Sequence, residues 1–435
     1  MVRLGRATHP IPRPSASGIV HFGLGAFHRA HQAVHTEDAM AATGDDRWGI
    51  CATGQRSGTT AELLARQDGL YTLLTGGEAR VIGALREVLP PGERAWARVA
   101  DPAVRVVTLT VTEKAYRADA PAISRLVYGM RLRMAADAGP LTVVSCDNLP
   151  GNGRLLAGLV TGACDGDARL RSWIEDNVRF PGTMVDRIVP ATTPDDVARA
   201  TRLIGAEDLA PVVTEPFSQW VIEDDFAAGR PAWELAGALF VPDARPYERM
   251  KLRLLNGSHS ALAYLGGLAG RELVARAVGE PVLGELVRRL MAEDLAPTLA
   301  GLDGFDLAAY QASLLARFGN PGVRHRLAQI ATDGTQKLPQ RLLDPARERL
   351  AAGGDARWIA LAVAGWARYA SAGRADDGAP LDLDDPLADR LSGATPGELL
   401  SLLADDLPGA FVTRVAEYAD RLSRDGVLAT LRAEL

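Results

Sequence analysis

Gly18-Ile-Val-His-Phe-Gly23-Leu-Gly25 predicts a short buried strand that runs directly into a glycine turn. The residues that follow, Ala26 to Ala42, have helical character. Glycines between a strand and a helix allow a tight turn and a close approach of the backbone to a pyrophosphate, which then lies at the N-terminus of the helix. The segment therefore predicts the first strand, turn and helix of a dinucleotide-binding fold.

The dinucleotide-binding pattern G-x-G-x-x-G is incomplete here, because His28 stands where its third glycine belongs. A Gly-x-Gly pair is weak evidence in a chain with 44 glycines. Its position between a strand and a helix gives it weight. The predicted cofactor-binding residues are Gly23, Gly25, Phe27 and Arg29. Arg29 could supply charge to the pyrophosphate or lie on the exposed face of the helix.

Further strands and helices alternate up to about residue 240. Trp48–Thr53 is a second short strand, and Val104–Thr112 has the β-branched, mostly apolar composition of a strand covered on both faces. A helix is expected over about Ala120–Ala138 and another strand over Leu141–Cys146. This alternation predicts an α/β fold, with a doubly wound, Rossmann-like domain over residues 1–240.

A mainly α-helical domain is expected over residues 241–435, because strand signals nearly vanish there. From Tyr247 onward, apolar residues recur at helical spacing. The segments with this spacing include Val287–Leu299, Leu307–Phe318, Arg341–Ala351, Trp358–Ala370 and Pro408–Leu431.

The segment Lys251-Leu-Arg-Leu-Leu-Asn256-Gly-Ser-His259 places an amine, an amide and an imidazole at the start of a long apolar helix. At about 100° per residue, Lys251 and His259 lie roughly 80° apart around an α-helix. Such groups are costly to bury unless they hydrogen-bond to each other or to a ligand. Burial also lowers the pKa of a lysine, which makes a general base available near neutral pH. A lysine that reaches solvent and a satisfied histidine on an ordinary helix are the structural alternative.

Composition excludes several classes of protein. The chain has 435 residues, 47% of them hydrophobic and 23% charged, as in globular proteins of two domains. It has no run of about 18 uncharged apolar residues, so no membrane span is predicted, and Met1–Ser17 lack the apolar core of a secretory signal. The net charge of −6 and the absence of a Lys/Arg block argue against a nucleic-acid partner.

Cysteine and histidine usage predicts a metal-free cytoplasmic protein. The three cysteines are Cys51, Cys146 and Cys164. They form no C-x-x-C pair, and such wide spacing is typical of reduced thiols. His28, His31 and His35 share one presumed helix face. No nearby cysteine or carboxylate completes a ligand set, so no metal site is predicted.

The end of the second strand bears on the choice of cofactor. A dinucleotide fold usually has Asp or Glu there to hold the ribose hydroxyls. This chain has Thr53-Gly-Gln-Arg-Ser57 instead, and an arginine at this place can favour the phosphorylated cofactor. NAD is the expected cofactor, and the sequence leaves NADP open.

Five motifs occur in order over nearly the whole chain. They are Gly23-Leu-Gly-Ala-Phe-His-Arg-Ala-His31, Ser145-Cys-Asp-Asn148, Phe180-Pro-Gly-Thr-Met-Val-Asp-Arg187, Glu215-Pro-Phe217 and Lys251-x4-Asn256-x2-His259. Together they resemble the mannitol dehydrogenase family of polyol-specific long-chain dehydrogenases. Three further segments are most similar to the members that act on D-mannonate and D-fructuronate, and these are Thr110-Val-Thr-Glu-Lys114, Trp220-Val-Ile-Glu-Asp224 and Gly334-Thr-Gln-Lys-Leu-Pro-Gln-Arg341.

The resemblance implies a metal-independent, NAD(P)-dependent interconversion of a secondary alcohol and a ketone on an open-chain sugar acid or polyol. Carried over to this chain, it makes Lys251 the general acid/base and gives Asn148 and Asn256 the role of amide donors to the developing alkoxide. His259 would position the substrate hydroxyl. The reaction is expected in the cleft between the sheet and the helical domain.

The resemblance also places Val185 and Asp186 at the edge of the active site. Three departures from the family pattern concern substrate and cofactor choice rather than reaction class. Ser218 stands where an arginine is expected, Ala115 replaces a glycine, and the acid after the second strand is absent.

A sugar-acid substrate needs a cationic partner for its carboxylate, because arginine can hold a carboxylate with two hydrogen bonds. The candidates are Arg324, Arg326, Lys337 and Arg341. The expected partner is this small molecule alone, and the chain is expected to be a monomer or a small homo-oligomer.

Several alternatives stay open at this stage. The substrate could be mannitol or another neutral polyol. Tyr247-x3-Lys251 matches the Tyr/Lys pair of short-chain dehydrogenases but lies far beyond the predicted sheet. A non-catalytic NAD-binding sensor would have no need of a buried base. A hydrolase is disfavoured, because Gly257-Ser258-His259 is not a nucleophile elbow.

Overall fold

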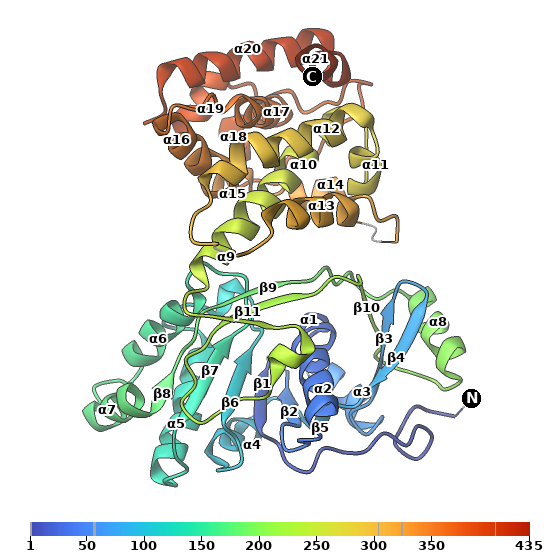
Figure 1. Cartoon of the computed structure of the whole chain (residues 1–435), viewed down its shortest axis with the longest axis vertical. Helices are drawn as coiled ribbons and strands as arrows, with labels where there is room; N and C mark the ends of the chain where they lie inside the picture. Colours follow the sequence, from blue (N-terminus) through green and yellow to red (C-terminus); the bar gives the residue numbers. More distant parts are fainter. Residues whose placement is uncertain (1, 55–57, 303, 323–324, 405) are drawn as a thin grey trace. The chain divides into compact units, whose positions relative to one another are not determined.

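The computed structural model describes residues 2–54, 58–302, 304–322, 325–404 and 406–435. The chain divides into two compact units, Met1–Arg245 and Pro246–Leu435. The first unit is an α/β domain and the second is helical (Figure 1). Both parts of the predicted fold class are confirmed.

A six-stranded parallel sheet forms the centre of the first domain, in the order β5-β2-β1-β6-β7-β8. Its strands are β1 (Ile19–Phe22), β2 (Ile50–Thr53), β5 (Leu85–Leu89), β6 (Val106–Leu109), β7 (Leu141–Ser145) and β8 (Val178–Arg179). The order reverses between β1 and β6. In such sheets, ligands bind at the carboxyl ends of the strands beside this switch point.

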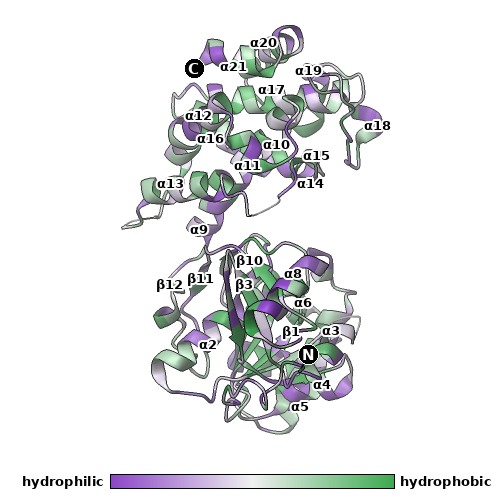
Figure 2. Cartoon of the chain, turned by 90° about the vertical axis from the view of Figure 1, so that its right-hand side faces the viewer, coloured by the Kyte–Doolittle hydropathy of each residue, from purple (hydrophilic) through white to green (hydrophobic). Residues whose placement is uncertain are grey.

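Alternate residues of these strands enter two hydrophobic cores, one on each face of the sheet. Ile19 belongs to the core that also contains Ala33 and Val34 of helix α2 (Gln32–Thr43), here termed the α2 core. Val20, the next residue, belongs to the core that contains Leu126 of helix α5 (Pro121–Ala135), here termed the α5 core. The predicted coverage of the sheet on both faces is therefore confirmed, and the hydrophobic colouring of its strands agrees (Figure 2).

Short helices connect the strands of this domain. They are α1 (Ala26–Ala30), α2 (Gln32–Thr43), α3 (Thr59–Ala65), α4 (Glu93–Ala97), α5 (Pro121–Ala135), α6 (Asn152–Gly162), α7 (Ala168–Asn177) and α8 (Pro194–Ile204), with 3₁₀ turns η1 (Arg98–Ala100), η2 (Glu113–Ala115) and η3 (Trp233–Ala236). The prediction of a single helix over residues 26–42 is wrong at one position, because the helix breaks at His31 (φ −126°, ψ −88°). The Nε2 atom of His31 lies 3.0 Å from the carbonyl oxygen of Gln219, so a distant contact holds the break.

Two three-stranded sheets, which the sequence did not predict, complete the first domain. One has the order β10-β3-β4 and the other β12-β11-β9. Their strands are β3 (Tyr71–Thr75), β4 (Glu78–Ile82), β9 (Thr183–Asp186), β10 (Val212–Thr214), β11 (Gln219–Glu223) and β12 (Leu239–Val241).

The second domain is built of helices and helical turns. They are α9 (Arg245–Met250), η4 (Lys251–Gly257), α10 (Ser258–Leu268), α11 (Val274–Val278), α12 (Pro281–Arg289), η5 (Leu290–Leu295), η6 (Ala296–Thr298), α13 (Leu307–Phe318), α14 (Leu327–Ala331), α15 (Gly334–Leu338), η7 (Pro339–Leu343), α16 (Asp344–Ala351), α17 (Arg357–Ala372), α18 (Ala388–Leu391), α19 (Pro396–Leu403), α20 (Gly409–Asp425) and α21 (Val427–Glu434). Every residue of α10 is buried. This helix packs against α17 and α14.

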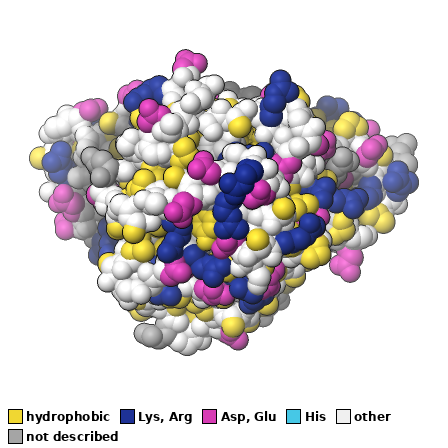
Figure 3. Space-filling view, turned by 90° about the horizontal axis from the view of Figure 1, so that it is seen from above, with side chains coloured by type: hydrophobic (Ala, Val, Ile, Leu, Met, Phe, Trp, Pro, Cys, Tyr) yellow, Lys and Arg dark blue, Asp and Glu magenta, His cyan; other side chains and the backbone are white. Residues whose placement is uncertain are grey.

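Within the described ranges, the structure has no helix that is both long enough and apolar enough to cross a membrane. On the face drawn in Figure 3, basic and acidic side chains are interspersed with small hydrophobic areas.

Candidate active site

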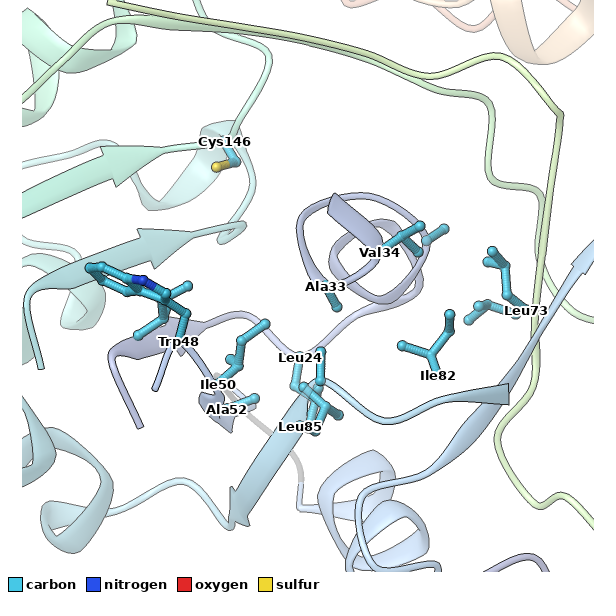
Figure 4. Close-up of a cluster of buried hydrophobic side chains, with 14 of the residues drawn as sticks. Leu24, Ala33, Val34, Trp48, Ile50, Ala52, Leu73, Ile82, Leu85 and Cys146 are labelled. Carbon is cyan, nitrogen blue, oxygen red and sulfur yellow. The ribbon is translucent and has the colours of Figure 1, made fainter. Parts of the chain in front are cut away.

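The predicted glycine turn leaves the sheet at the switch point. Gly23 has φ +111°, and a Cβ at this position would lie 1.9 Å from the carbonyl oxygen of Thr110, the residue after β6. Only glycine avoids this clash. Leu24 enters the α2 core (Figure 4), whereas Gly25, which precedes α1, is exposed. The backbone of the turn is thus open where a sheet of this kind binds a pyrophosphate, so it fits a dinucleotide.

Two buried histidines pack next to the turn, in the interior of the domain. The Nε2 atom of His21 lies 3.0 Å from both the carbonyl oxygen of Gly23 and the hydroxyl of Thr110. The imidazole of His28 stacks on His21 with ring centroids 3.3 Å apart. Burial lowers the pKa of His21 to about 3 and that of His28 well below its usual value. The side chain at the third glycine position therefore packs as a neutral ring within the domain.

Arg29 is buried, so the expectation that it could lie on the exposed face of the helix is wrong. Its guanidinium donates to the carbonyl oxygens of Gly25 and Ala210 and lies 5.5 Å from the ring centroid of Tyr71. The residue is 7% exposed. Because the guanidinium donates to backbone carbonyl oxygens and lies near the ring of Tyr71, it contacts groups inside the domain. Arg29 therefore stabilises the turn, and the structure gives no support to a contact with a pyrophosphate. Phe27 is half-buried beside the turn.

The remaining histidines of this segment hydrogen-bond to protein groups. His35 contacts the carbonyl oxygen of Ala236 at 2.9 Å and the hydroxyl of Ser218 at 3.0 Å, and burial lowers its pKa to about 4. Among the described residues, no group of three or more His, Cys, Asp or Glu side chains could hold a metal ion. Ser218, where an arginine was expected, lines a cavity of about 340 Å³ together with His35 and Arg187.

Asn148 lies on the loop after β7, at the carboxyl edge of the sheet, and is exposed. The preceding carboxylate, Asp147, is buried and accepts hydrogen bonds from the backbone N–H groups of Val111 and Thr112, both at 2.9 Å, and from the hydroxyl of Tyr116 at 2.8 Å. Burial raises the pKa of Asp147. These bonds tie the loop of Asn148 to the end of β6.

Asp186 and Val185 end strand β9 in the first domain and are buried. Residues 55–57, on which the choice between NAD and NADP depends, lie outside the described residues, as does the substrate candidate Arg324.

In the second domain, Lys251 and Asn256 share the π-helical turn η4, which runs from Lys251 to Gly257 and continues into α10. Lys251 is 8% exposed and Asn256 is half-buried. A π-helix places residue i+5 next to residue i. The regular α-helix expected from the sequence would set these residues about 140° apart. π-helical turns are rare and often mark functional sites.

His259 lies in α10 and is 7% exposed. Its ring centroid is 4.6 Å from that of Phe318 and 5.2 Å from that of His325. In the part of the chain that the structure describes, its Nε2 atom is buried and has no hydrogen-bond partner. Burial lowers the pKa of His259 well below its usual value, and the further groups that lower it are His325, Arg317, Arg341 and Lys251.

The predicted carboxylate-binding cations differ in their surroundings. The Nζ atom of Lys337 donates to the carbonyl oxygen and the hydroxyl of Thr332, at 2.6 and 2.9 Å. Arg326 is exposed. Arg341 donates to the hydroxyl of Ser260 at 3.1 Å, beside His259.

Sequence reasoning missed Arg317 and His325. Arg317 is buried, and both residues lower the pKa of His259. An arginine at the end of an amphipathic helix looks like a surface residue in the sequence, so no sequence signal distinguished it. Tyr247, the alternative catalytic residue, packs edge-to-face on Phe305.

Comparison with known proteins assigns the chain to a family. The mannitol dehydrogenase Rossmann domain matches residues 17–235, and the mannitol dehydrogenase C-terminal domain matches residues 243–431. The chain belongs to the mannitol dehydrogenase family. The resemblance inferred from the motifs is thereby confirmed, and with it the predicted class of oxidoreductase that acts on CH–OH groups.

The relatives that match over most of both chains include enzymes named for different substrates. The chain is 42% identical to D-mannonate oxidoreductase of Escherichia coli, over 97% of this chain and 98% of that protein. It is 36% identical to mannitol 2-dehydrogenase of Pyrenophora tritici-repentis, over 95% and 81%. The solved Pseudomonas fluorescens mannitol 2-dehydrogenase, a ternary complex with NAD and D-mannitol, matches with a TM-score of 0.83 and 33% identity over 100% of this chain and 99% of that one.

Proposed function

We propose that this protein interconverts a secondary alcohol and a ketone on an open-chain sugar acid, D-mannonate and D-fructuronate, with NAD as the cofactor. The observation that carries the proposal is the buried Lys251 in one π-helical turn with Asn256, followed by His259 with a buried nitrogen that lacks a partner among the described residues. The 42% identity to D-mannonate oxidoreductase favours the sugar acid. The match to mannitol 2-dehydrogenase makes a neutral polyol the second candidate.

The glycine turn would hold the cofactor. Gly23 and the exposed Gly25 offer backbone at the switch point, and Phe27 lies beside them. When bound, NAD would supply the hydride chemistry, as the acceptor in alcohol oxidation and, in its reduced form, as the donor in ketone reduction.

Lys251 would move the proton. In alcohol oxidation its neutral amine accepts the hydroxyl proton while the ketone forms. In ketone reduction its ammonium returns that proton to the oxygen. Because Lys251 is buried at 8% exposure, bulk water does not compete for this step.

Two amides would stabilise the substrate oxygen. Asn256 follows Lys251 in η4, and Asn148 is exposed at the carboxyl edge of the sheet. We propose that their NH₂ groups donate to the charge that develops on this oxygen, as in an oxyanion hole. The buried Nε2 atom of His259 would bind a substrate hydroxyl and so gain the partner that it otherwise lacks in the described structure.

The location proposed for the protein is the cytoplasm. Cys51, Cys146 and Cys164 are all free and buried, as is usual for proteins of reducing compartments.

A spectrophotometric assay tests the function. Purified protein is given D-fructuronate or D-fructose, each with NADH and then with NADPH, and the loss of reduced cofactor is followed. The proposal expects turnover of D-fructuronate with NADH and little turnover of D-fructose. Turnover of D-fructose alone would establish the polyol alternative, and turnover with neither ketone would contradict both.

A further inference from the structure

Asn152, the first residue of α6, is fully buried and joins two segments of the first domain. Its Nδ2 atom donates to the carbonyl oxygens of Asp147 and Thr183, both at 3.0 Å. Its Oδ1 atom accepts the backbone N–H of Thr183 at 3.0 Å. Asp147 lies just after β7 and Thr183 begins β9, so one side chain ties these two segments together (Figure 1).

The hydrogen bond to Asp147 bears directly on Asn148. The carbonyl that Asn152 holds belongs to the peptide group between Asp147 and Asn148, and a peptide group is planar. Holding this oxygen therefore fixes the orientation of the backbone from which the side chain of Asn148 extends. The hydrogen bonds to Thr183 act in the same way on β9, which ends three residues later at Asp186.

Thr183 provides a second link between the same two strands. Its hydroxyl donates to the carbonyl oxygen of Ser145, the last residue of β7, and lies 3.2 Å from the Nδ2 atom of Asn152. The residue is 2% exposed. Because β7 and β9 belong to different sheets, these side chains supply a connection between them.

The side chain of Asp147 fixes the same loop to the end of β6. Its carboxylate accepts hydrogen bonds from the backbone N–H groups of Val111 and Thr112. Thr112 has φ +71°, a positive value that is rare in a β-branched residue. Such strain persists where the surrounding contacts impose it, and it is concentrated at functional sites. Asn148 thus follows a residue that is anchored to β6 by its side chain and to Asn152 by its backbone.

The start of α6 packs closely against the segment before β9. A Cβ at Gly153 would clash with the carbonyl oxygen of Phe180 and lie 2.7 Å from the backbone nitrogen of Gly182, so only glycine fits there. This close approach of the two backbones brings Asn152 within hydrogen-bonding distance of Thr183.

We propose that Asn152 is a positioning residue, which holds Asn148 in a fixed place relative to Asp186 and acts on the reaction through the amide of Asn148. This inference rests on the proposed function, in which that amide donates to the charge on the substrate oxygen. Such a donor has to lie within about 2.7–3.1 Å of the oxygen. A misplacement of about 1 Å can cost about 10²-fold in rate. The buried hydrogen bonds of Asn152 give the loop this precision.

A double-mutant cycle separates positioning from a purely structural role. The variants are Asn152→Ala, Asn148→Ala, the double variant and the control Asn177→Ala. Asn177 is a half-buried asparagine at the end of α7 that donates to the carbonyl oxygen of Trp173 at 2.9 Å. For each protein, kcat and KM are measured with D-fructuronate and NADH, and the Kd of NADH is measured by fluorescence.

Asn152→Ala should lower kcat about 10²-fold and leave the Kd of NADH unchanged, because the amide of Asn148 is displaced. The double variant should be at most about threefold slower than Asn148→Ala, since an absent amide cannot be misplaced. Asn177→Ala should keep the kinetics of the wild type. An equal fold-loss of kcat from Asn152→Ala with and without the amide of Asn148 would overturn the proposal. So would a wild-type kcat in Asn152→Ala.

Thr183→Val serves as a milder second variant, because it keeps the shape of the side chain and removes only its hydroxyl. It should lower kcat by a smaller factor than Asn152→Ala, and it should have no effect in the Asn148→Ala background. This variant carries the same test if Asn152→Ala does not fold. An equal loss in both backgrounds would contradict the proposal here as well.

Two further measurements distinguish a failure of this proposal from a failure of the proposed function. The cycle is run with whichever ketone the wild type reduces, so turnover of D-fructose alone contradicts only the proposed substrate. Hydrogen–deuterium exchange needs no substrate. Peptides that cover residues 145–151 and 183–186 should exchange faster in Asn152→Ala or Thr183→Val than in the wild type, whereas peptides from α5 should not change. Unchanged exchange in the first two segments would overturn the positioning role even if the wild type reduced neither ketone.

Discussion

Lys251 and Asn256 occupy the first and sixth positions of one π-helical turn, so the amine and the amide belong to neighbouring positions on the helix surface. In a regular α-helix the same residues would lie on well-separated faces, about 140° apart. In the proposed mechanism, the extra residue in the turn would let Lys251 as the base and Asn256 as a hydrogen-bond donor reach the same substrate oxygen. The predictions below test this arrangement and the parts of the fold that support it.

Replacement of Lys251 by alanine should remove the proton acceptor and leave the cofactor site intact. We expect kcat to fall about 10²- to 10⁴-fold, the usual contribution of general acid/base catalysis. Stopped-flow or steady-state kinetics measure the loss, and fluorescence titration with NADH should give a Kd close to that of the wild type. An amine such as methylamine should restore part of the activity. Normal turnover in this variant would show that Lys251 is not the base.

Replacement of Asn256 by alanine should lower kcat about 10²- to 10³-fold, because one donor to the developing oxyanion is lost. Asn256→Asp should not restore activity, since a carboxylate accepts rather than donates hydrogen bonds. The Kd of NADH, measured by fluorescence, serves as the control and should not change. If kcat stayed near the wild-type value, the amide would have only a structural role.

Two glycines of the same turn should respond differently to alanine. At Gly23 a Cβ would meet the carbonyl oxygen of Thr110 at 1.9 Å and φ is +111°, so Gly23→Ala should cost at least about 2 kcal/mol of unfolding free energy. At Gly25 the nearest atom would be 3.7 Å away, so Gly25→Ala should keep its stability in urea titrations.

The Kd of NADH then decides whether a pyrophosphate passes over Gly25. A methyl group on the exposed turn should weaken NADH binding in Gly25→Ala although the fold is intact. Unchanged affinity in this variant would place the cofactor elsewhere.

Acid should destabilise the protein through its buried histidines. The pKa of His35 is about 4 in the folded state because of burial, and about 6.5 in the unfolded chain. Between these values the unfolded state binds more protons, so stability falls as pH drops from about 6.5 toward 4. At pH 5 the contribution of His35 to this loss is on the order of 2 kcal/mol.

Urea unfolding of wild type and His35→Gln at pH 5 and pH 7.5 tests this sign. Because carboxylates titrate equally in both proteins, the difference between them isolates the imidazole. The variant should lose less stability than the wild type on acidification. An equal or larger loss in His35→Gln would indicate that His35 is charged in the folded protein.

The sequence by itself determined the fold class and the identity of the catalytic candidates. The strand before Gly23 and the strand over Val104–Thr112 were predictable because their composition suits a sheet covered on both faces, and both occur, as β1 and β6. The helix Leu307–Phe318 was predicted with its observed bounds, since its apolar spacing is uninterrupted. The order of motifs over nearly the whole chain indicated the family that the comparisons then confirmed.

Tertiary contacts decided where the polar side chains of these segments lie. The break at His31 and the two small sheets depend on segments distant in the sequence, which local apolar spacing does not encode. The π-helical turn at Lys251 packs on the distant turn η7, a contact that the local sequence does not show either. The contacts of the arginines were not predictable either, because the sequence does not show which of their long side chains are buried. Arg29 serves the interior of its domain, whereas Arg341 reaches Ser260 beside His259. The sequence determined which residue types are present. Packing determined which of them can contact a ligand, because only the folded chain fixes the direction of each side chain and excludes water from its surroundings.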